Sequence, residues 1–117
     1  MNAQQLQNTI VAWSDKTFGS SILDRHGRQM PIDRREGMLN HMLKEIEELR
    51  ETPNSPMEMA DIFMLLLDYA GHSGVTVDLL FDATLRKLQI NMKRKWGPVL
   101  PDGSIEHVRE DAHKPNI

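Results

Sequence analysis

Several features are absent from this 117-residue sequence, and each absence excludes a class of protein. There is no cysteine, so neither a disulfide framework nor a thiolate metal site can form. The longest apolar run, from Ile62 to Leu67, is far too short to span a bilayer. The first residues, Met1 to Gln5, lack the basic start and apolar stretch of a signal peptide. We therefore expect a cytoplasmic protein with no membrane partner.

The sequence also lacks a strong charge of one sign. Fourteen Lys and Arg residues are interspersed with 17 Asp and Glu residues, giving a net charge of −3. This balance argues against a protein that binds a nucleic acid polymer. We find no internal repeat, and the length suits a single domain over residues 1–117 that can bury a modest core.

No pattern typical of a strand is present, and the spacing of apolar residues predicts an all-α fold of four helices. An N-cap serine, Ser55, followed by Pro56 marks one helix start, and the capping-box spacing of Asp33 and Glu36 marks another. A polar loop is expected from Thr17 to Asp33, and an irregular tail from about residue 97. The predicted helices are Ala3–Lys16, one that starts at Arg34 and ends before the connection Glu51–Pro56, one from Pro56 to about Tyr69 or Ala70, and one from about Val77 to Lys95.

The third predicted helix is apolar nearly all round, which is typical of a buried central helix. Asp61 and Asp68 interrupt it seven residues apart, on one stripe. A lone buried carboxylate is costly unless it is paired or bound to a metal. Asp61 in particular is expected to meet little solvent. The fourth helix is expected to turn one apolar face inward, formed by Val77, Leu80, Phe81, Thr84, Leu85 and Leu88.

Two pairs of acids flank the connection between the second and third helices. Glu45 and Glu48 are three residues apart, as are Glu58 and Asp61, so each pair shares one helical face. Helices joined by so short a connection are normally antiparallel neighbours, which lets the two pairs face each other. Four converging carboxylates repel one another unless a cation is present, and hard oxygen ligands are what Mg²⁺ prefers. We therefore predict that these four residues bind Mg²⁺.

The same acids have simpler interpretations that the sequence leaves open. Glu58 can reach back to the backbone of Ser55 in a capping box. The acids from Glu45 to Glu51 can form a solvated helix face, with Lys44 paired to Glu48. Either arrangement would need no metal.

Two other classes of protein are also open. A di-iron carboxylate bundle needs Glu-x-x-His on two helices, and the only such spacing here, Glu110 to His113, falls in the tail. A non-catalytic helical oligomerisation or interaction module would use the acids only as surface. The basic segment from Lys93 to Trp96 fits either a helix C-terminus that complements the macrodipole or a contact to a phosphorylated ligand.

The acid pairs, taken with the basic segment, resemble the MazG-like all-α nucleoside triphosphate pyrophosphohydrolases. The resemblance is closer to the dATP/dGTP diphosphohydrolase branch found in bacteria and their viruses, and it covers most of the chain. The gap between the acid pairs is short for the wider superfamily, although it suits this branch. The segments that carry the resemblance are Asn40–Leu49, Glu58–Asp61 running into Leu66-Leu67-Asp68, Lys87–Gly97, Asp102–Val108, and Trp13 with Phe18-Gly19.

The resemblance implies a four-helix MazG-like bundle that hydrolyses a purine deoxynucleoside triphosphate, dGTP or dATP, between its α and β phosphates, in the host cytoplasm if the protein is viral. The products would be a deoxynucleoside monophosphate and pyrophosphate. Mg²⁺, with Mn²⁺ as a substitute, would lower the pKa of an attacking water, and Glu48 or Glu45 would accept its proton. The residues expected to contact the nucleotide are Lys44, Asn91, Lys93 and Lys95 toward the phosphates, Trp13, Phe18 and Trp96 toward the base, and His41 beside the acids.

We further expect a homo-oligomer, at least a dimer and up to a tetramer. The third predicted helix is apolar on almost every side, and in so small a chain the three other helices, which are amphipathic, cannot easily cover all of it. The surface left over would be a larger apolar patch than monomers usually expose, and two-fold pairing is the commonest way to bury it. The resemblance agrees, since similar enzymes assemble active sites at subunit interfaces.

Overall fold

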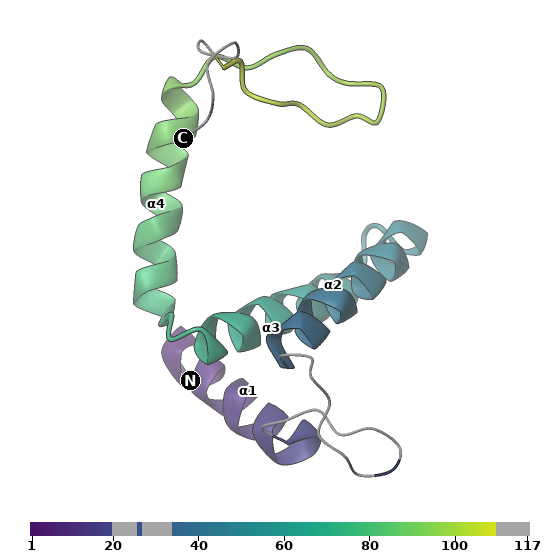
Figure 1. Ribbon diagram of the computed structural model, residues 1–117, viewed down its shortest axis with the longest axis vertical. Helices are drawn as coiled ribbons and strands as arrows, with labels where there is room; N and C mark the ends of the chain where they lie inside the picture. Colours follow the sequence, from purple (N-terminus) through teal and green to yellow (C-terminus); the bar gives the residue numbers. More distant parts are fainter. Residues whose placement is uncertain (20–25, 27–33, 110–117) are drawn as a thin grey trace. The chain divides into compact units, whose positions relative to one another are not determined.

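A computed structural model of the chain describes residues 1–19, 26 and 34–109. Its helices are α1 (Ala3–Phe18), α2 (Arg34–Glu51), α3 (Pro56–His72) and α4 (Val77–Lys93), shown in Figure 1. Within these described residues there is no strand, and one isolated antiparallel bridge pairs Trp96 with His107. The prediction of an all-α fold with four helices is confirmed, and all four begin at the predicted residue.

Some predicted features lie outside the described residues. Asp33, the expected N-cap of α2, is one, and so is most of the loop expected from Thr17 to Asp33. Glu110 and His113, the spacing considered for a di-iron site, lie beyond the last described residue. No helix in the described ranges is long and apolar enough to cross a membrane.

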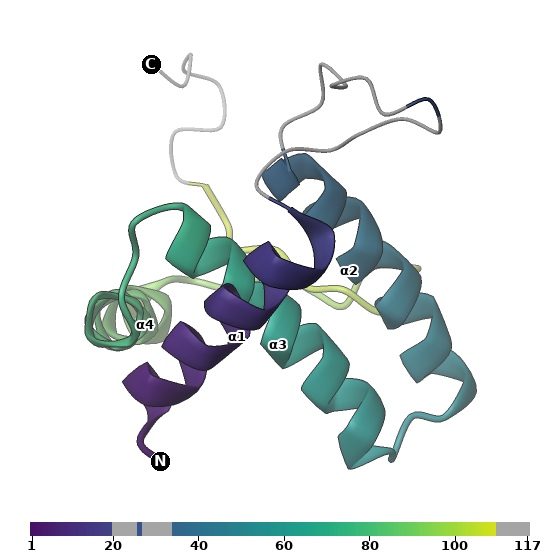
Figure 2. The same ribbon diagram turned by 90° about the horizontal axis from the view of Figure 1, so that it is seen from below.

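The chain divides into two compact units, residues 1–81 and 82–117, and each is described by itself. In the first unit both α1 and α2 pack against α3. Figure 2 shows α2 running alongside α3, with α1 lying across the C-terminal half of α3. The predicted pairing of α2 with α3 is therefore confirmed.

Local capping explains where two of these helices begin. At the start of α1, the Asn2 side chain accepts from the backbone N–H of Gln5 (2.8 Å), and the Gln5 side chain accepts from the N–H of Asn2 (2.8 Å). At the start of α3, Ser55 Oγ accepts from the backbone N–H of Glu58 (3.2 Å), and Pro56 occupies the first helical position. Each cap satisfies an N–H group that the helix itself leaves without a partner.

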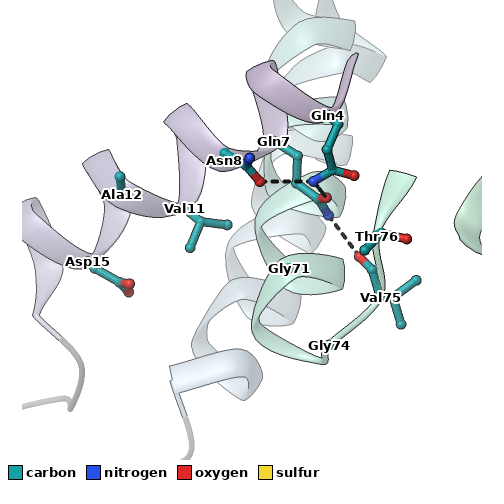
Figure 3. Close-up of a pocket in the computed structure, with 10 residues that line it drawn as sticks. All are labelled: Gln4, Gln7, Asn8, Val11, Ala12, Asp15, Gly71, Gly74, Val75 and Thr76. Carbon is teal, nitrogen blue, oxygen red and sulfur yellow. Dashed lines mark hydrogen bonds between the residues drawn. The ribbon is translucent and has the colours of Figure 1, made fainter. Parts of the chain in front are cut away.

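The contact between α1 and the end of α3 depends on a glycine. A Cβ atom added to Gly71 would lie 2.5 Å from Cγ2 of Val11, so only glycine allows this approach without a shift. Beside it, the buried Gln7 amide donates to the carbonyl oxygens of Leu67 (3.1 Å) and Val75 (2.9 Å), which lie at and beyond the end of α3. Figure 3 shows this amide pointing from α1 into the turn after α3. An open hollow of about 440 Å³ lies along the same contact.

A polar cluster joins α1, α2 and α3. The buried carboxylate of Asp68 accepts from Ser14 Oγ at 2.6 Å. Arg34, the first residue of α2, donates to Ser14 Oγ and to Oδ1 of Asp15, the latter at 2.7 Å. His72 Nε2 lies 2.7 Å from the same Asp15 oxygen. Asp68 can be buried because it is hydrogen-bonded and lies close to these cationic groups.

The burial of α3 differs from the prediction of a fully buried central helix. Its buried residues are Leu67, Asp68 and Ala70, all in the C-terminal half, whereas Phe63 is 52 % exposed. The expectation that Asp61 meets little solvent was wrong, because its residue surface is exposed. The buried acid of α3 is instead Asp68, since α1 crosses α3 at that turn.

Neither unit by itself buries the inward apolar face that was predicted for α4. No residue of α4 is buried, and Phe81, Leu85 and Leu88 are 61 %, 45 % and 53 % exposed. An amphipathic helix of this kind gains stability when its apolar stripe packs on another surface.

In the second unit, residues 95–108 fold back on themselves after α4 (Figure 1). The N–H of Val108 donates to the Lys95 carbonyl (2.6 Å), and the N–H of Gly97 donates to the Glu106 carbonyl (2.9 Å). At the far end, Leu100 and Ser104 are joined by a 2.7 Å backbone hydrogen bond. The part of the predicted irregular tail that the structure describes is thus a closed loop.

Candidate active site

Three of the predicted metal ligands converge where α2 and α3 face each other. Glu45 and Glu48 come from α2 and Glu58 from α3, and one carboxylate oxygen from each lies within 4.8 Å of the others. The i, i+3 spacing on α2 and the antiparallel packing of α3 bring them together. Asp61 lies one turn after Glu58, outside this group of three.

Burial and mutual repulsion raise the pKa of carboxylates in the cluster. Burial raises the pKa of Glu45, and the neighbouring carboxylates of Glu48 and then Asp61 raise it further. The pKa of Glu58 is raised in the same way, first by burial and then by the charges of Glu48 and Asp61. Asp61 is thus close enough to act on both groups. Bringing a cation into this cluster would relieve the repulsion.

Two oxygen atoms of the cluster are buried without a hydrogen-bond donor. Among the residues that the structure describes, Oε2 of Glu45 and Oε2 of Glu58 have no partner. A buried acceptor left in this state is costly. Together with the mutual repulsion, these oxygens form a donor set that fits a hard divalent cation such as Mg²⁺ or Mn²⁺.

The structure also tests the two simpler interpretations of these acids. The N–H of Ser55 donates to the Thr52 carbonyl (3.1 Å), so it is not capped by Glu58, whose carboxylate turns toward the cluster instead. In the described part of the chain, Lys44 forms no ion pair with Glu48, whereas Arg50 pairs with Glu47 at 3.4 Å. Capping and surface pairing therefore do not account for Glu48 and Glu58.

An aromatic-walled hollow of about 130 Å³ adjoins the acids. The rings of Trp13 and Phe18 meet edge to face with centroids 5.4 Å apart, and the guanidinium carbon of Arg34 lies 5.9 Å from the centre of the Phe18 ring. His41 Nε2 lies 3.0 Å from Oε1 of Glu45, which connects this wall to the acid cluster. The residues that line the hollow are Ile10, Trp13, Phe18, His41, Glu45, Asp61, Met64 and Leu65.

Sequence reasoning found part of this lining and missed the rest. Trp13, Phe18 and His41 were predicted, but Ile10, Met64 and Leu65 were not. A signal for the latter two was present, because both lie about one helical turn beyond Asp61 and therefore near the same face. Arg34 could not be found in this way, since its contact with Phe18 depends on how α1 and α2 pack.

The remaining predicted contacts lie elsewhere in the chain. Lys44 is exposed on α2, next to Glu45. Asn91, Lys93, Lys95 and Trp96 belong to the second unit, where the carbonyl of Asn91 accepts from Trp96 Nε1 at 2.9 Å. Their contacts with a nucleotide stay predictions.

Comparison with known proteins decides the family. The family model for dATP/dGTP pyrophosphohydrolases matches residues 6–114. This chain belongs to the dATP/dGTP pyrophosphohydrolase family. It is a nucleoside triphosphate pyrophosphohydrolase, as the resemblance of its acid pairs implied, and the alternative of a non-catalytic module is set aside.

The similar proteins that we compare come from cyanophage S-2L. A dATP/dGTP diphosphohydrolase is 37 % identical over 80 residues, which are 67 % of this chain and 72 % of that protein. A solved structure of a MazG-like pyrophosphohydrolase, bound to dGDP and three catalytic Mn²⁺ ions per active site, matches with a TM-score of 0.68. The match has 29 % identity and covers 93 % of this chain and 99 % of that one, so the MazG-like fold is confirmed.

Proposed function

We propose that this pyrophosphohydrolase cleaves dGTP or dATP between the α and β phosphates, with Mg²⁺ as the working metal and Mn²⁺ as a substitute. The observation that carries the proposal is the cluster of Glu45, Glu48 and Glu58 with its two unpartnered buried oxygens. The products are a deoxynucleoside monophosphate and pyrophosphate. The substrate is drawn from the free nucleotides of the cytoplasm, of the host if the protein is viral.

Glu45, Glu48, Glu58 and Asp61 hold the metal in this proposal. When bound, Mg²⁺ neutralises phosphate charge and lowers the pKa of a coordinated water. Glu48 is the more exposed of the two α2 acids, so its carboxylate is better placed to accept the proton of the attacking water, with Glu45 as the second candidate. The cyanophage relative with bound Mn²⁺ supports a divalent metal at the site.

The aromatic hollow beside the acids is the proposed base site. Trp13 and Phe18 are 52 % and 58 % exposed, and their rings provide flat apolar surface on which a purine can stack. His41 lies at the boundary between this surface and Glu45, so a nucleotide seated here would place its phosphates toward the acids. The cyanophage structure with bound dGDP supports a purine nucleotide as ligand.

The phosphate chain needs cationic contacts as well as metal. Lys44 lies next to the acid cluster in sequence and is exposed. Asn91, Lys93 and Lys95, with Trp96, supply further polar and aromatic groups in the second unit. In this proposal the Asn91 amide and the three lysines bind the phosphates, and Trp96 makes an additional stacking contact.

We also propose that the enzyme works as a homo-oligomer, a dimer or a tetramer. Phe63 on α3 and Phe81, Leu85 and Leu88 on α4 are exposed in the single chain. So much apolar surface is usually covered by a partner, and a second copy is the commonest one.

A panel of deoxynucleoside and ribonucleoside triphosphates, assayed with Mg²⁺ and with Mn²⁺, tests this function. Chromatography of the products distinguishes cleavage between the α and β phosphates, which gives a monophosphate and pyrophosphate, from release of orthophosphate. The proposal expects the first outcome, with dGTP or dATP as the best substrate. A diphosphate and orthophosphate as products would overturn the assigned cleavage site.

A further inference from the structure

Charge is distributed unevenly between the two units. Residues 82–117 contain seven Lys and Arg residues and five Asp and Glu residues, whereas residues 1–81 contain seven and twelve. The acid cluster lies in the acidic unit. The described part of the second unit is cationic, so it is the part of the chain suited to attract a polyanion.

A small hollow lies within this cationic unit, where the chain folds back after α4. It has a volume of about 280 Å³ and is lined by Trp96, Ile105, Glu106, His107 and Arg109. The bridge between Trp96 and His107 joins the two sides of the loop, and the two rings meet edge to face with centroids 6.1 Å apart and an interplanar angle of 83°. The volume is near the lower end of the range of about 300–1,000 Å³ for ligand pockets.

The charges of several cationic groups act on the imidazole of His107. Burial lowers the pKa of His107, and the charges of Arg94, Arg109 and Lys87 lower it further, while Glu106 acts in the opposite direction. Within residues 82–109, none of these three cations forms an ion pair with a carboxylate. The guanidinium of Arg94 donates instead to the neutral amide oxygen of Asn91, at 3.0 Å.

This excess of positive charge requires an explanation. Among the described groups that act on this imidazole, three are cations and one, Glu106, is a carboxylate. In an ordinary solvated helix face, opposite charges alternate and pair. Here the hollow has the guanidinium of Arg109 and the ring of Trp96 in its lining, and the charge of Arg94 acts on the His107 imidazole in the same lining. A guanidinium beside an aromatic wall is a combination typical of sites that bind phosphate groups.

We propose that Arg94, His107 and Arg109 form a phosphate-binding site in the second unit that takes a pyrophosphate group, either free or as part of a nucleotide, with Trp96 as its wall. The two guanidinium groups pair with phosphate oxygens, and the imidazole donates a hydrogen bond. The proposal rests on the proposed function for the chemical class of the ligand, while the site itself rests on the geometry of residues 94–109. None of the three residues belongs to the acid cluster or to the aromatic hollow.

Binding of pyrophosphate to the full-length protein in EDTA, followed by calorimetry and by the NMR signals of the His107 ring, tests the site without any turnover. We expect Arg109→Gln to weaken pyrophosphate binding about ten-fold or more, the loss expected for one charge-assisted hydrogen bond. Arg86→Gln is the matched control, because it removes the same charge from an exposed residue of α4 outside the hollow and should change the affinity less than about two-fold. Pyrophosphate should also raise the pKa of His107 in the wild type, which a merely structural role of Arg109 would not explain.

Parallel titrations with orthophosphate, dGMP and dGTP identify which phosphate group the site accepts. If Arg109→Gln and Arg86→Gln weaken binding equally, the attraction is diffuse and the proposal is wrong. It is equally wrong if metal-free protein binds no pyrophosphate while hydrolysis with Mg²⁺ proceeds, and that result leaves the proposed function intact. A protein that binds pyrophosphate at His107 but hydrolyses no nucleotide would support this site and reject the proposed function.

Discussion

The carboxylate of Glu45 is hydrogen-bonded to His41 one turn earlier on α2, with 3.0 Å between Nε2 and Oε1. This contact acts against the other influences on Glu45, because burial and the charges of Glu48 and Asp61 raise its pKa whereas His41 lowers it. His41 therefore helps to keep a proposed metal ligand ionised. It also lines the aromatic hollow, so it links the proposed base site to the acid cluster.

The first prediction is that His41→Ala weakens metal binding. Without the imidazole, Glu45 loses the contact that orients it, and outer contacts of this kind are typically worth about 10–100-fold in metal affinity. The Mg²⁺ concentration that gives half-maximal pyrophosphate release should rise about ten-fold, with a smaller effect at saturating metal. Glu47→Ala, which alters an exposed residue of the same helix, should leave the metal titration unchanged. An unaltered titration for His41→Ala would show that the hydrogen bond has no role in metal binding.

The second prediction concerns the pH dependence of stability through His72. Burial disfavours the charged imidazole, but the hydrogen bond to Asp15 and the contacts with Asp68 outweigh it, so the pKa of His72 is raised above 6.5. The folded state therefore binds this proton more tightly than the unfolded state does. The stabilising contribution is complete below about pH 6.5 and is lost as the pH rises through the raised pKa.

Urea unfolding on both sides of this window checks the sign. The free energy of unfolding of the wild type should fall more between about pH 6 and about pH 8 than that of His72→Gln. The difference between the two changes in free energy of unfolding gives the contribution of His72, because the other histidines are present in both proteins. The groups that face its ring are Asp15, Arg34 and Asp68. If the two profiles are parallel, the contact with Asp15 contributes nothing to stability.

The third prediction is that Gly71→Ala destabilises the protein. The new methyl group would meet Val11 at 2.5 Å, and overpacking of this kind costs about 1–3 kcal/mol, offset by up to about 1 kcal/mol from better helix propensity. The midpoint of thermal unfolding should fall. The double variant Gly71→Ala, Val11→Ala should lose less stability than the sum of the two single changes, because it removes the clash. Simple additivity would mean that α1 and α3 are not in close contact at this position.

The fourth prediction is that the enzyme is an oligomer in solution. Light scattering coupled to size exclusion should give at least twice the chain mass of 13.5 kDa. Leu88→Glu, which places a charge on the exposed apolar stripe of α4, should shift the protein toward smaller species. Gln89→Glu introduces the same charge beside the stripe and should not. A fully active species of 13.5 kDa would show that one chain suffices.

The sequence predicted the features that depend on local chemistry. Ser55 and Pro56 mark the start of α3 because capping and the fixed φ of proline act within a few residues. Glu45 and Glu48 share a face because helical geometry places i and i+3 together, and the short connection brings α3 alongside. These signals were sufficient to predict a converging acid cluster.

The sequence could not predict what depends on how the helices cross. Asp61 and Asp68 lie on one stripe of α3, and only the position of α1 decides that Asp68 is the buried one, hydrogen-bonded to Ser14. The bridge between Trp96 and His107 was missed for a similar reason, since a single pair creates no alternating pattern.

The central claim is that carboxylates from α2 and α3 together hold the metal that hydrolysis requires. The most direct test is the rate of pyrophosphate release from dGTP at saturating Mg²⁺ for Glu58→Gln, which keeps the shape of the side chain and removes its charge. Glu51→Gln makes the same change at the exposed end of α2 and is the control. We predict that Glu58→Gln lowers this rate more than about a hundred-fold, which exceeds the typical effect of changing a residue that only hydrogen-bonds to a metal ligand. The metal-free stability should equal or exceed that of the wild type, because repulsion between the carboxylates is relieved. A Glu58→Gln enzyme that releases pyrophosphate at the wild-type rate would contradict the assignment of the acid cluster as the metal site.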